Sequence, residues 1–200
     1  MTDRAVVILA AGASLRLGQP KALVSFAGQK LLARAVEAAS GAGAAAWFTE
    51  SDAQSLLSAS LPSAFGARRL SVSNADEGMS ASLRVAATTA ISDHRIQFLC
   101  VLPVDQYAVD ARWLSALFDL ALQYPNRMVA STIAGRRGAP AVFSRGRFAD
   151  LLTLSGDRGA RELLRTAPDD AVIDWPAPWP PGDVDTIADL AVMASWQPPS

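Results

Sequence analysis

The chain has very little of the residues that most often build disulfides and transition-metal sites. Its 200 residues include one cysteine, Cys100, and one histidine, His94. A single cysteine excludes a disulfide within the chain, and a single histidine excludes a metal site built from histidines. Cys100 lies in an apolar stretch and is expected to be buried, whereas His94 is expected in a solvated loop.

The chain also lacks an excess of either charge and any long apolar run. Lys and Arg total 18 and Asp and Glu total 19, so the formal net charge is −1. This balance gives no electrostatic footprint for nucleic acid or an anionic membrane. The apolar stretch 6–11 is too short for a signal peptide core and follows acidic Asp3, and nothing approaches a membrane-spanning length. We expect a cytoplasmic protein without nucleic-acid or membrane partners.

What the chain does contain is a regular alternation of strand-like and helix-like segments. Such alternation predicts a Rossmann-like α/β/α sandwich of three layers, with a mainly parallel central sheet and ligands at the carboxyl ends of its strands. After a first strand that begins at Val6, the expected strands are 44–49, 70–73, 96–102, 128–133 and 141–143. The expected helices are 30–45 (ended by Gly41 and Gly43), 52–61, 80–91, 111–123, 148–154 and 160–165.

The first apolar run leads into a short loop of small residues, with two cations close behind. From Val6 to Lys21 the sequence is Val-Val-Ile-Leu-Ala-Ala-Gly-Ala-Ser-Leu-Arg-Leu-Gly-Gln-Pro-Lys. Small residues let backbone N–H groups approach a ligand closely, and Arg16 and Lys21 add positive charge. The pattern indicates a polyphosphate site, and an ordinary strand–turn–helix with surface cations is the alternative.

Two common phosphate motifs fit this loop poorly. A Walker loop has four residues between its glycines and then Gly-Lys-Ser/Thr. Here five residues separate Gly12 from Gly18, and Ala22 follows Lys21. The dinucleotide fingerprint needs three glycines in register after the strand, and this loop supplies only one. A nicotinamide-dependent oxidoreductase, in which Glu50 would hold the ribose, is kept as an alternative from another class.

The loop resembles the signature of the nucleotidyltransferases related to molybdenum cofactor cytidylyltransferase. The matching positions are Leu9-Ala10-Ala11-Gly12, Ser14, Arg16, Gly18, Pro20-Lys21 and Leu23. The resemblance continues in order as far as Leu190. It implies one nucleotidyltransferase domain over 1–200, with a fold of the nucleotide-diphospho-sugar transferase type. The implied reaction moves CMP from CTP to a phosphate-bearing acceptor, with molybdopterin favoured, and releases pyrophosphate.

A carboxylate, Asp105, follows the expected central strand. Position alone equally allows it to form a turn or to hold Mg²⁺, which prefers oxygen ligands. The resemblance implies the metal role, and it implies a second metal carboxylate, Asp185, in the late segment Asp183-Val184-Asp185-Thr186. It further implies that Arg16, Lys21 and Asp105 are the catalytic residues. Asp189 is expected to be a charge in the first turn of a helix.

The segment Asp76-Glu77-Gly78-Met79-Ser80-Ala81-Ser82 precedes an expected helix. Ser80 is expected to cap that helix and Gly78 to permit an unusual backbone angle, so helix initiation alone would explain both. In the resembling family this segment faces the nucleobase, and its pattern favours the cytidylyl branch. The nucleotide-binding residues that the resemblance implies are Leu9, Ala10, Ala11, Gly12, Ser14, Arg16, Lys21, Gly78, Ser80 and Ser82.

The acceptor end of the site is less well defined. The resemblance implies acceptor binding by Gln106, Asp157 and Arg161, but Ala139 replaces a family histidine and Tyr107 a family proline. The alternatives are therefore a guanylyltransferase, a sugar-phosphate nucleotidyltransferase, or a non-catalytic molybdenum cofactor binding or insertion partner. A molybdoenzyme or its insertion chaperone is a candidate protein partner. The tryptophans of 175–182 are expected to cap the core, with a dimer surface as the alternative.

Overall fold

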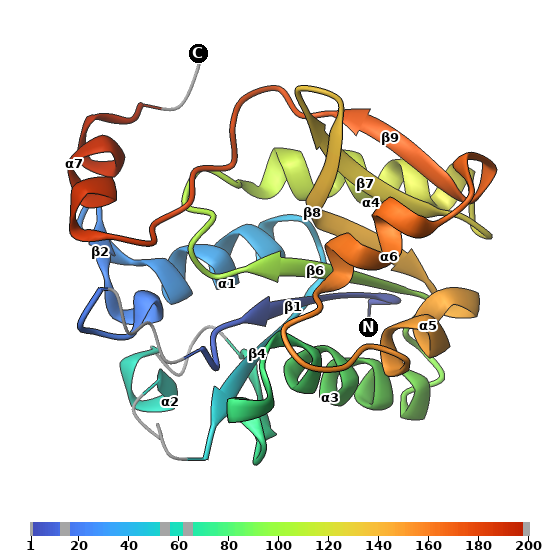
Figure 1. The fold of residues 1–200 in the computed structure, drawn as a ribbon, viewed down its shortest axis with the longest axis horizontal. Coiled ribbons are helices and arrows are strands. Elements are labelled where there is room, and N and C mark those ends of the chain that lie inside the picture. Colours follow the sequence, from blue (N-terminus) through green and yellow to red (C-terminus); the bar gives the residue numbers. More distant parts are fainter. Residues whose placement is uncertain (1, 13–16, 53–56, 62–65, 198–200) are drawn as a thin grey trace.

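The computed structural model describes residues 2–12, 17–52, 57–61 and 66–197. Seven strands form one twisted sheet in the order β5–β4–β1–β6–β8–β7–β9 (Figure 1). Their bounds are β1 Arg4–Leu9, β4 Ala45–Ser51, β5 Arg68–Val72, β6 Phe98–Pro103, β7 Met128–Ile133, β8 Arg136–Ser144 and β9 Val172–Pro176. Only β8 runs against its neighbours, because it pairs antiparallel with β6 and β7. The expectation of a mainly parallel sheet is confirmed.

Helices cover both faces of the sheet and complete the three layers (Figure 1). Their bounds are α1 Leu31–Gly41, α2 Leu57–Ser60, α3 Met79–Ser92, α4 Ala111–Gln123, α5 Phe148–Leu152, α6 Ala160–Thr166 and α7 Ile187–Ser195. Short elements between them are the hairpin β2 Ser25–Phe26 with β3 Gln29–Lys30, and 3-10 turns at Lys21–Leu23, Ala75–Glu77, Arg145–Arg147 and Asp169–Ala171. This architecture is an α/β sandwich, as the alternation of segments predicts.

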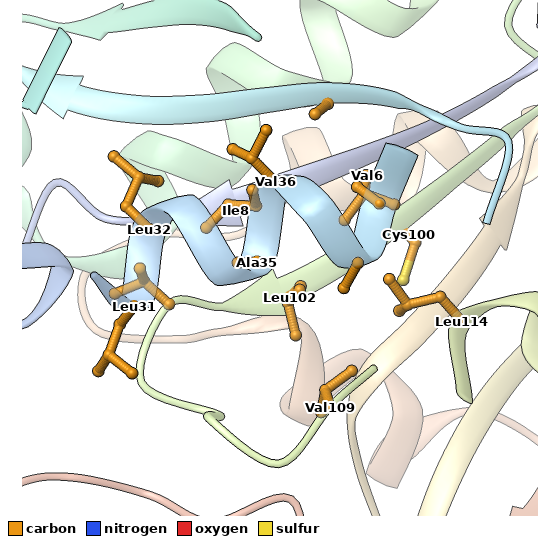
Figure 2. Close-up of a cluster of buried hydrophobic side chains, with 14 of the residues drawn as sticks. Val6, Ile8, Leu31, Leu32, Ala35, Val36, Cys100, Leu102, Val109 and Leu114 are labelled. Atoms are coloured by element: carbon orange, nitrogen blue, oxygen red, sulfur yellow. The ribbon is translucent and has the colours of Figure 1, made fainter. Parts of the chain in front are cut away.

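The core divides into two apolar layers because β1 is buried on both of its faces. Val6 and Ile8 point into the layer under α1 and α4, whereas Ala5 and Val7 point into the layer under α3, α5 and α6. Figure 2 shows the first layer, in which α1 lies over β1 and Cys100 of β6. Cys100 is buried as predicted, and its burial raises the pKa of its thiol.

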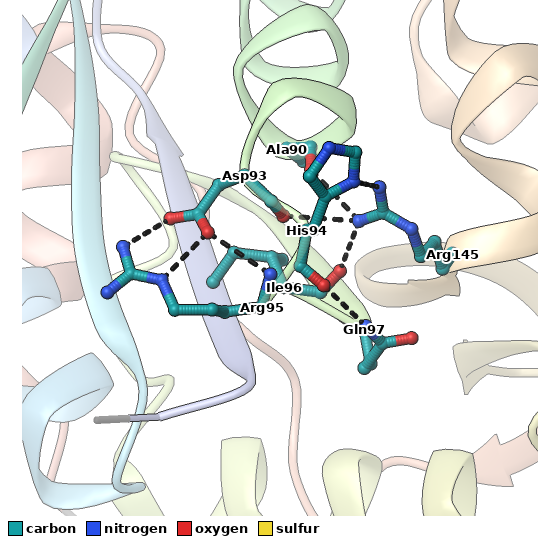
Figure 3. Close-up of polar contacts among 7 residues, drawn as sticks. All are labelled: Ala90, Asp93, His94, Arg95, Ile96, Gln97 and Arg145. Atoms are coloured by element: carbon teal, nitrogen blue, oxygen red, sulfur yellow. Dashed lines mark hydrogen bonds and ion pairs between the residues drawn. The ribbon is translucent and has the colours of Figure 1, made fainter.

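Arg145 closes the end of α3, and its contacts place His94 (Figure 3). The Arg145 guanidinium donates hydrogen bonds to the carbonyls of Ala90, Asp93 and Ile96, at 3.3, 3.1 and 2.8 Å. The carbonyl of Ala90 belongs to the last turn of α3, where the helix leaves carbonyls without donors, and those of Asp93 and Ile96 belong to the segment that leads to β6. His94 is exposed on the same turn, with Nδ1 3.2 Å from an Arg145 nitrogen, so its predicted loop position is confirmed.

The segment that follows β9, residues 177–186, is called the C-terminal return, and it brings Asp185 to the carboxyl ends of β1 and β6. Trp175 and Trp179 pack edge-on against buried Trp113, with ring centroids 5.5 and 5.6 Å away, so the expectation that tryptophans cap the core is confirmed. The chain then passes to Trp196, which contacts Phe26 and Tyr107.

No helix in the described ranges is both long enough and apolar enough to cross a membrane.

Candidate functional site

The carboxyl ends of β1 and β6 open into a cavity of about 710 Å³. The start of α3, the turn before α6 and the segment before α7 supply its other walls. The residues that line it are Leu9, Ala10, Ala11, Gly12, Lys21, Ala75, Asp76, Gly78, Met79, Ser82, Pro103, Val104, Asp105, Asp157 and Asp185. This is the edge of the sheet at which the topology predicts a ligand.

The loop after β1 is held in place by its neighbouring strands. The N–H of Ala10 donates to the Thr49 hydroxyl of β4 at 3.0 Å, and the N–H of Val104 donates to the Leu9 carbonyl at 3.2 Å. The predicted loop residues from Leu9 to Gly12 therefore lie together at the cavity. Two further predicted residues, Ser14 and Arg16, lie outside the described ranges.

The strongest electrostatic feature of the cavity is a lysine between two carboxylates. Lys21 Nζ lies 2.5 Å from Asp105 Oδ2 and 2.6 Å from Asp185 Oδ1. Burial of Lys21 lowers its pKa, but the hydrogen bonds and charges of the two carboxylates outweigh this, and the net pKa is raised above its usual 10.5. The predicted catalytic and metal residues Lys21, Asp105 and Asp185 are thus brought together, with the lysine as an ammonium ion.

The cap of α7 fixes the backbone that carries Asp185. Thr186 and Asp189 form a capping box, and the Asp189 carboxylate accepts hydrogen bonds from the N–H groups of Asp185 and Thr186 at 2.9 and 2.7 Å. The prediction that Asp189 is a first-turn helix charge is confirmed. The cap holds the Asp185 backbone at the cavity rather than leaving it to an unconstrained loop.

The two carboxylates fit a hard divalent cation. One oxygen from each lies within 2.6 Å of the same atom, Lys21 Nζ, so the pair already converges on one positive charge. Among the described residues there is no group of three or more His, Cys, Asp or Glu side chains suited to a metal. Mg²⁺ is commonly held by one or two carboxylates, with waters and substrate phosphates as its other ligands. Desolvation and the nearby Asp105 and Asp185 raise the pKa of the neighbouring Asp183.

The start of α3 differs from the sequence prediction. Gly78 is the residue that precedes the helix, with φ +111°, and no side chain caps it. The prediction that Ser80 is the cap is wrong: Ser80 lies inside the helix and is fully buried, and its N–H donates to the Gly156 carbonyl at 3.2 Å. A Cβ on Gly78 would lie 2.3 Å from Asp157 Oδ1, so only glycine lets the 156–157 turn approach this closely.

A charged pair that the sequence analysis missed holds that turn against α3. Arg84 donates to both carboxylate oxygens of Glu77, at 2.8 and 2.6 Å, and to the Leu154 carbonyl at 2.9 Å. The hydrogen bonds from Arg84 lower the pKa of the Glu77 carboxyl. The pair is separated by seven residues. Glu77 lies in the 3-10 turn before α3, and Gly78 interrupts the helical backbone between the two residues, so no helical periodicity in the sequence indicates this pair.

The predicted acceptor residues do not all reach the cavity. Asp157 lines it, but Gln106 and Arg161 are absent from its described walls. Gln106 instead donates to the Ala139 carbonyl at 3.1 Å, and Arg161 is exposed on α6. Tyr107 is also turned away from the cavity walls and packs on Phe26, with ring centroids 5.2 Å apart.

Glu50, which would hold the ribose in the oxidoreductase alternative, has a structural role instead. It is fully buried, pairs with Arg69 at 2.5 Å and accepts the N–H of Leu57 at 2.6 Å. It does not belong to the described cavity walls, which counts against a role in holding a ribose.

The mixed α/β sheet, flanked by helices and with its cavity at the strand ends, has the fold of the nucleotidyltransferases. The profile of the MobA-like NTP transferase domain matches residues 6–172, and the chain belongs to that family. It is a MobA-like nucleotidyltransferase.

Solved structures agree with this assignment. Rv0371c from Mycobacterium tuberculosis H37Rv is 28% identical, with 98% of each chain covered and a TM-score of 0.83. A complex of Rv0371c with manganese is 26% identical, covers 96% of this chain and 98% of that one, and has a TM-score of 0.78. Molybdopterin-guanine dinucleotide biosynthesis protein A from Archaeoglobus fulgidus is 16% identical, with 95% and 96% covered and a TM-score of 0.66, and shows the shared fold alone. A comparison with curated protein sequences found no match.

Proposed function

We propose that this protein transfers CMP from CTP to a phosphate-bearing acceptor, with molybdopterin favoured, and releases pyrophosphate. The observation that carries the proposal is the convergence of Lys21, Asp105 and Asp185 beside the loop at 9–12, in a cavity of about 710 Å³. Positive charge, backbone donors and carboxylates that fit a divalent cation are the groups that a triphosphate requires.

The proposed reaction needs no activated side chain as nucleophile. An oxygen of the acceptor phosphate forms a bond to the α-phosphorus, and the bond from that phosphorus to the bridging oxygen of pyrophosphate breaks. An ionised phosphate carries the electron pair, and pyrophosphate leaves with the pair of the broken bond. The protein then contributes positioning and neutralisation of charge.

Each part of the cavity has a proposed task. Lys21 is proposed to bridge the donor phosphates and the acceptor, and the backbone of Ala11 and Gly12 lines the same region. Asp105 and Asp185 would hold Mg²⁺, which when bound neutralises charge on the phosphates. The manganese complex of Rv0371c supports a divalent cation of this kind. Arg16, outside the described ranges, is proposed to bind the leaving phosphates through its planar guanidinium.

Cytosine is the favoured base because of the volume available at Ala11. Ala11 lines the cavity and is buried, so its methyl group takes space that a glycine would leave for a purine. Gly78 and Ser82 line the same cavity and are proposed to face the base. A guanylyltransferase or a sugar-phosphate nucleotidyltransferase with the same machinery is the second candidate, and a binding or insertion partner without catalysis is the third.

Thermal unfolding with Mg²⁺ and each of CTP, GTP, ATP, UTP and NAD tests the proposal. A ligand at 100 times its dissociation constant adds about 2.7 kcal/mol to the free energy of unfolding. A shift specific to CTP supports the cytidylyl assignment, and pyrophosphate release on addition of molybdopterin tests the acceptor. A shift with GTP alone would overturn the choice of base, and a shift with NAD alone would overturn nucleotidyl transfer.

A further inference from the structure

Lys21 occupies the point on which the two carboxylates converge. Its Nζ lies 2.5 Å from Asp105 Oδ2 and 2.6 Å from Asp185 Oδ1, and the Lys21 and Asp105 side chains are 18% and 16% exposed, whereas that of Asp185 is 48% exposed. An ammonium group and a divalent cation cannot share such a point, because two positive charges a few ångströms apart repel strongly where water is scarce. Either the lysine or the metal can hold both oxygens at one time.

We propose that Lys21 is the resident counter-ion of the Asp105–Asp185 pair and that a divalent cation binds by displacing it. The lysine stem is long and flexible and ends in a single compact charge, so its ammonium can leave without movement of the backbone. The displaced ammonium then turns to the nucleotide phosphates, a step that rests on the proposed function. Lys21 thus positions the carboxylates before the metal arrives and the phosphates afterwards.

Displacement has a direct thermodynamic consequence. A cation that binds without nucleotide must break the two ion pairs of Lys21. The free energy needed to break them is subtracted from the free energy of cation binding, so the affinity is lower. If Lys21 is replaced by an uncharged residue, Asp105 and Asp185 lose the ammonium group that competes with a divalent cation for their oxygens.

The test is a titration of the protein with Mn²⁺ in the absence of nucleotide, with free Mn²⁺ followed by electron paramagnetic resonance. Lys21→Met keeps the length of the side chain and removes its charge, and we expect its dissociation constant for Mn²⁺ to be at least tenfold lower than that of the wild type. Lys30→Met is the matched control, since it removes the same charge from β3, outside the described cavity walls, and should leave the affinity unchanged. In the double variant Lys21→Met, Asp105→Asn, the gain in Mn²⁺ affinity should be lost.

An unchanged or weaker affinity in Lys21→Met, in a protein whose circular dichroism matches the wild type, would overturn the proposal. Lys21→Gln serves as the second variant if Lys21→Met fails to fold. A gain that persists when Asp105→Asn is added would also overturn it, because the metal would then bind elsewhere. The titration contains no nucleotide, so its result is independent of whether CTP proves to be the substrate.

Discussion

At the scale of single residues, the site depends on charges that come from distant parts of the chain. Lys21 pairs with Asp105 across 84 residues and with Asp185 across 164. Only folding brings these three groups together. A local motif can therefore indicate Lys21 as a site residue, but it cannot show that Asp185 forms an ion pair with Lys21.

Replacing Lys21 or Asp105 by alanine should lower nucleotidyl transfer by a factor of about 10² or more, the range measured when one group that stabilises developing charge is removed. The reason is that Lys21→Ala removes positive charge at the phosphates and Asp105→Ala removes a proposed ligand of the divalent cation, while both leave the sheet and its helices in place. The measurement is pyrophosphate release at saturating CTP and Mg²⁺, with circular dichroism as the check on folding. Full activity in both variants would refute the proposed mechanism.

At the scale of elements, the turn 154–159 depends on α3 for its position. Arg84 and Glu77 form the link, with Arg84 also bound to the Leu154 carbonyl at 2.9 Å. The contact of Asp157 with Gly78 completes it on the cavity side. One wall of the cavity is therefore built from two segments that are far apart in the sequence.

Arg84→Met should increase hydrogen exchange of the amides at 155–159 several-fold, because it removes the hydrogen bonds that tie this turn to α3. Arg95→Met is the control, since Arg95 pairs with Asp93 at the other end of α3.

Acid should also increase hydrogen exchange of these amides, because protonation of Glu77 weakens its pair with Arg84. The pKa of Glu77 is lowered from 4.5 by Arg84, so its contribution is complete above pH 4.5 and is lost as the pH falls through the lowered value. Exchange in Glu77→Gln that is as slow as in the wild type at neutral pH would contradict this account.

The elements themselves were predictable to different degrees. The helix 111–123 and the strand 128–133 have their predicted bounds, because apolar periodicity and length agree there. The helix predicted over 30–45 ends at Gly41, since Gly43 adopts φ +70° and Ala45 already belongs to β4. Strand β9 and the hairpin β2–β3 were missed. The two-residue strands of the hairpin carry little periodic signal, and β9 is fixed by pairing with β7, which is distant in the sequence.

The candidate site was predictable in part for the same reasons. The loop at 9–12 and Asp105 come just after strands, so local sequence places them at the cavity, and Lys21 was found through the motif that continues this loop. Gln106 was expected there as well, but its side chain turns to the Ala139 carbonyl, a choice that only tertiary structure reveals. Ser80 was predicted to be the cap because serine is a common capping residue. The helix instead begins one residue earlier, at Met79, with Gly78 before it.

At the scale of the whole molecule, the C-terminal return completes the site by crossing the end of the domain. Gly182 lies on this path with φ +70°, and its backbone packs against the buried ring of Tyr107. Tyr107 also contacts Phe26 and Trp196, so one aromatic cluster holds the hairpin and the C-terminal helix together. This gives Tyr107 a role in docking the return segment.

Gly182→Ala should therefore impair the site more than a comparable glycine substitution elsewhere. The new Cβ would lie 2.4 Å from the Tyr107 ring, so the return must shift, and Asp185 follows it three residues later. Gly43→Ala is the matched control, because Gly43 has the same φ of +70° and no atom within 4 Å of its added Cβ. Both variants should lose about 1–3 kcal/mol of stability from the left-handed backbone. Only Gly182→Ala should lose Mn²⁺ affinity as well, and equal affinities in the two variants would show that Asp185 is placed at the cavity independently of the return.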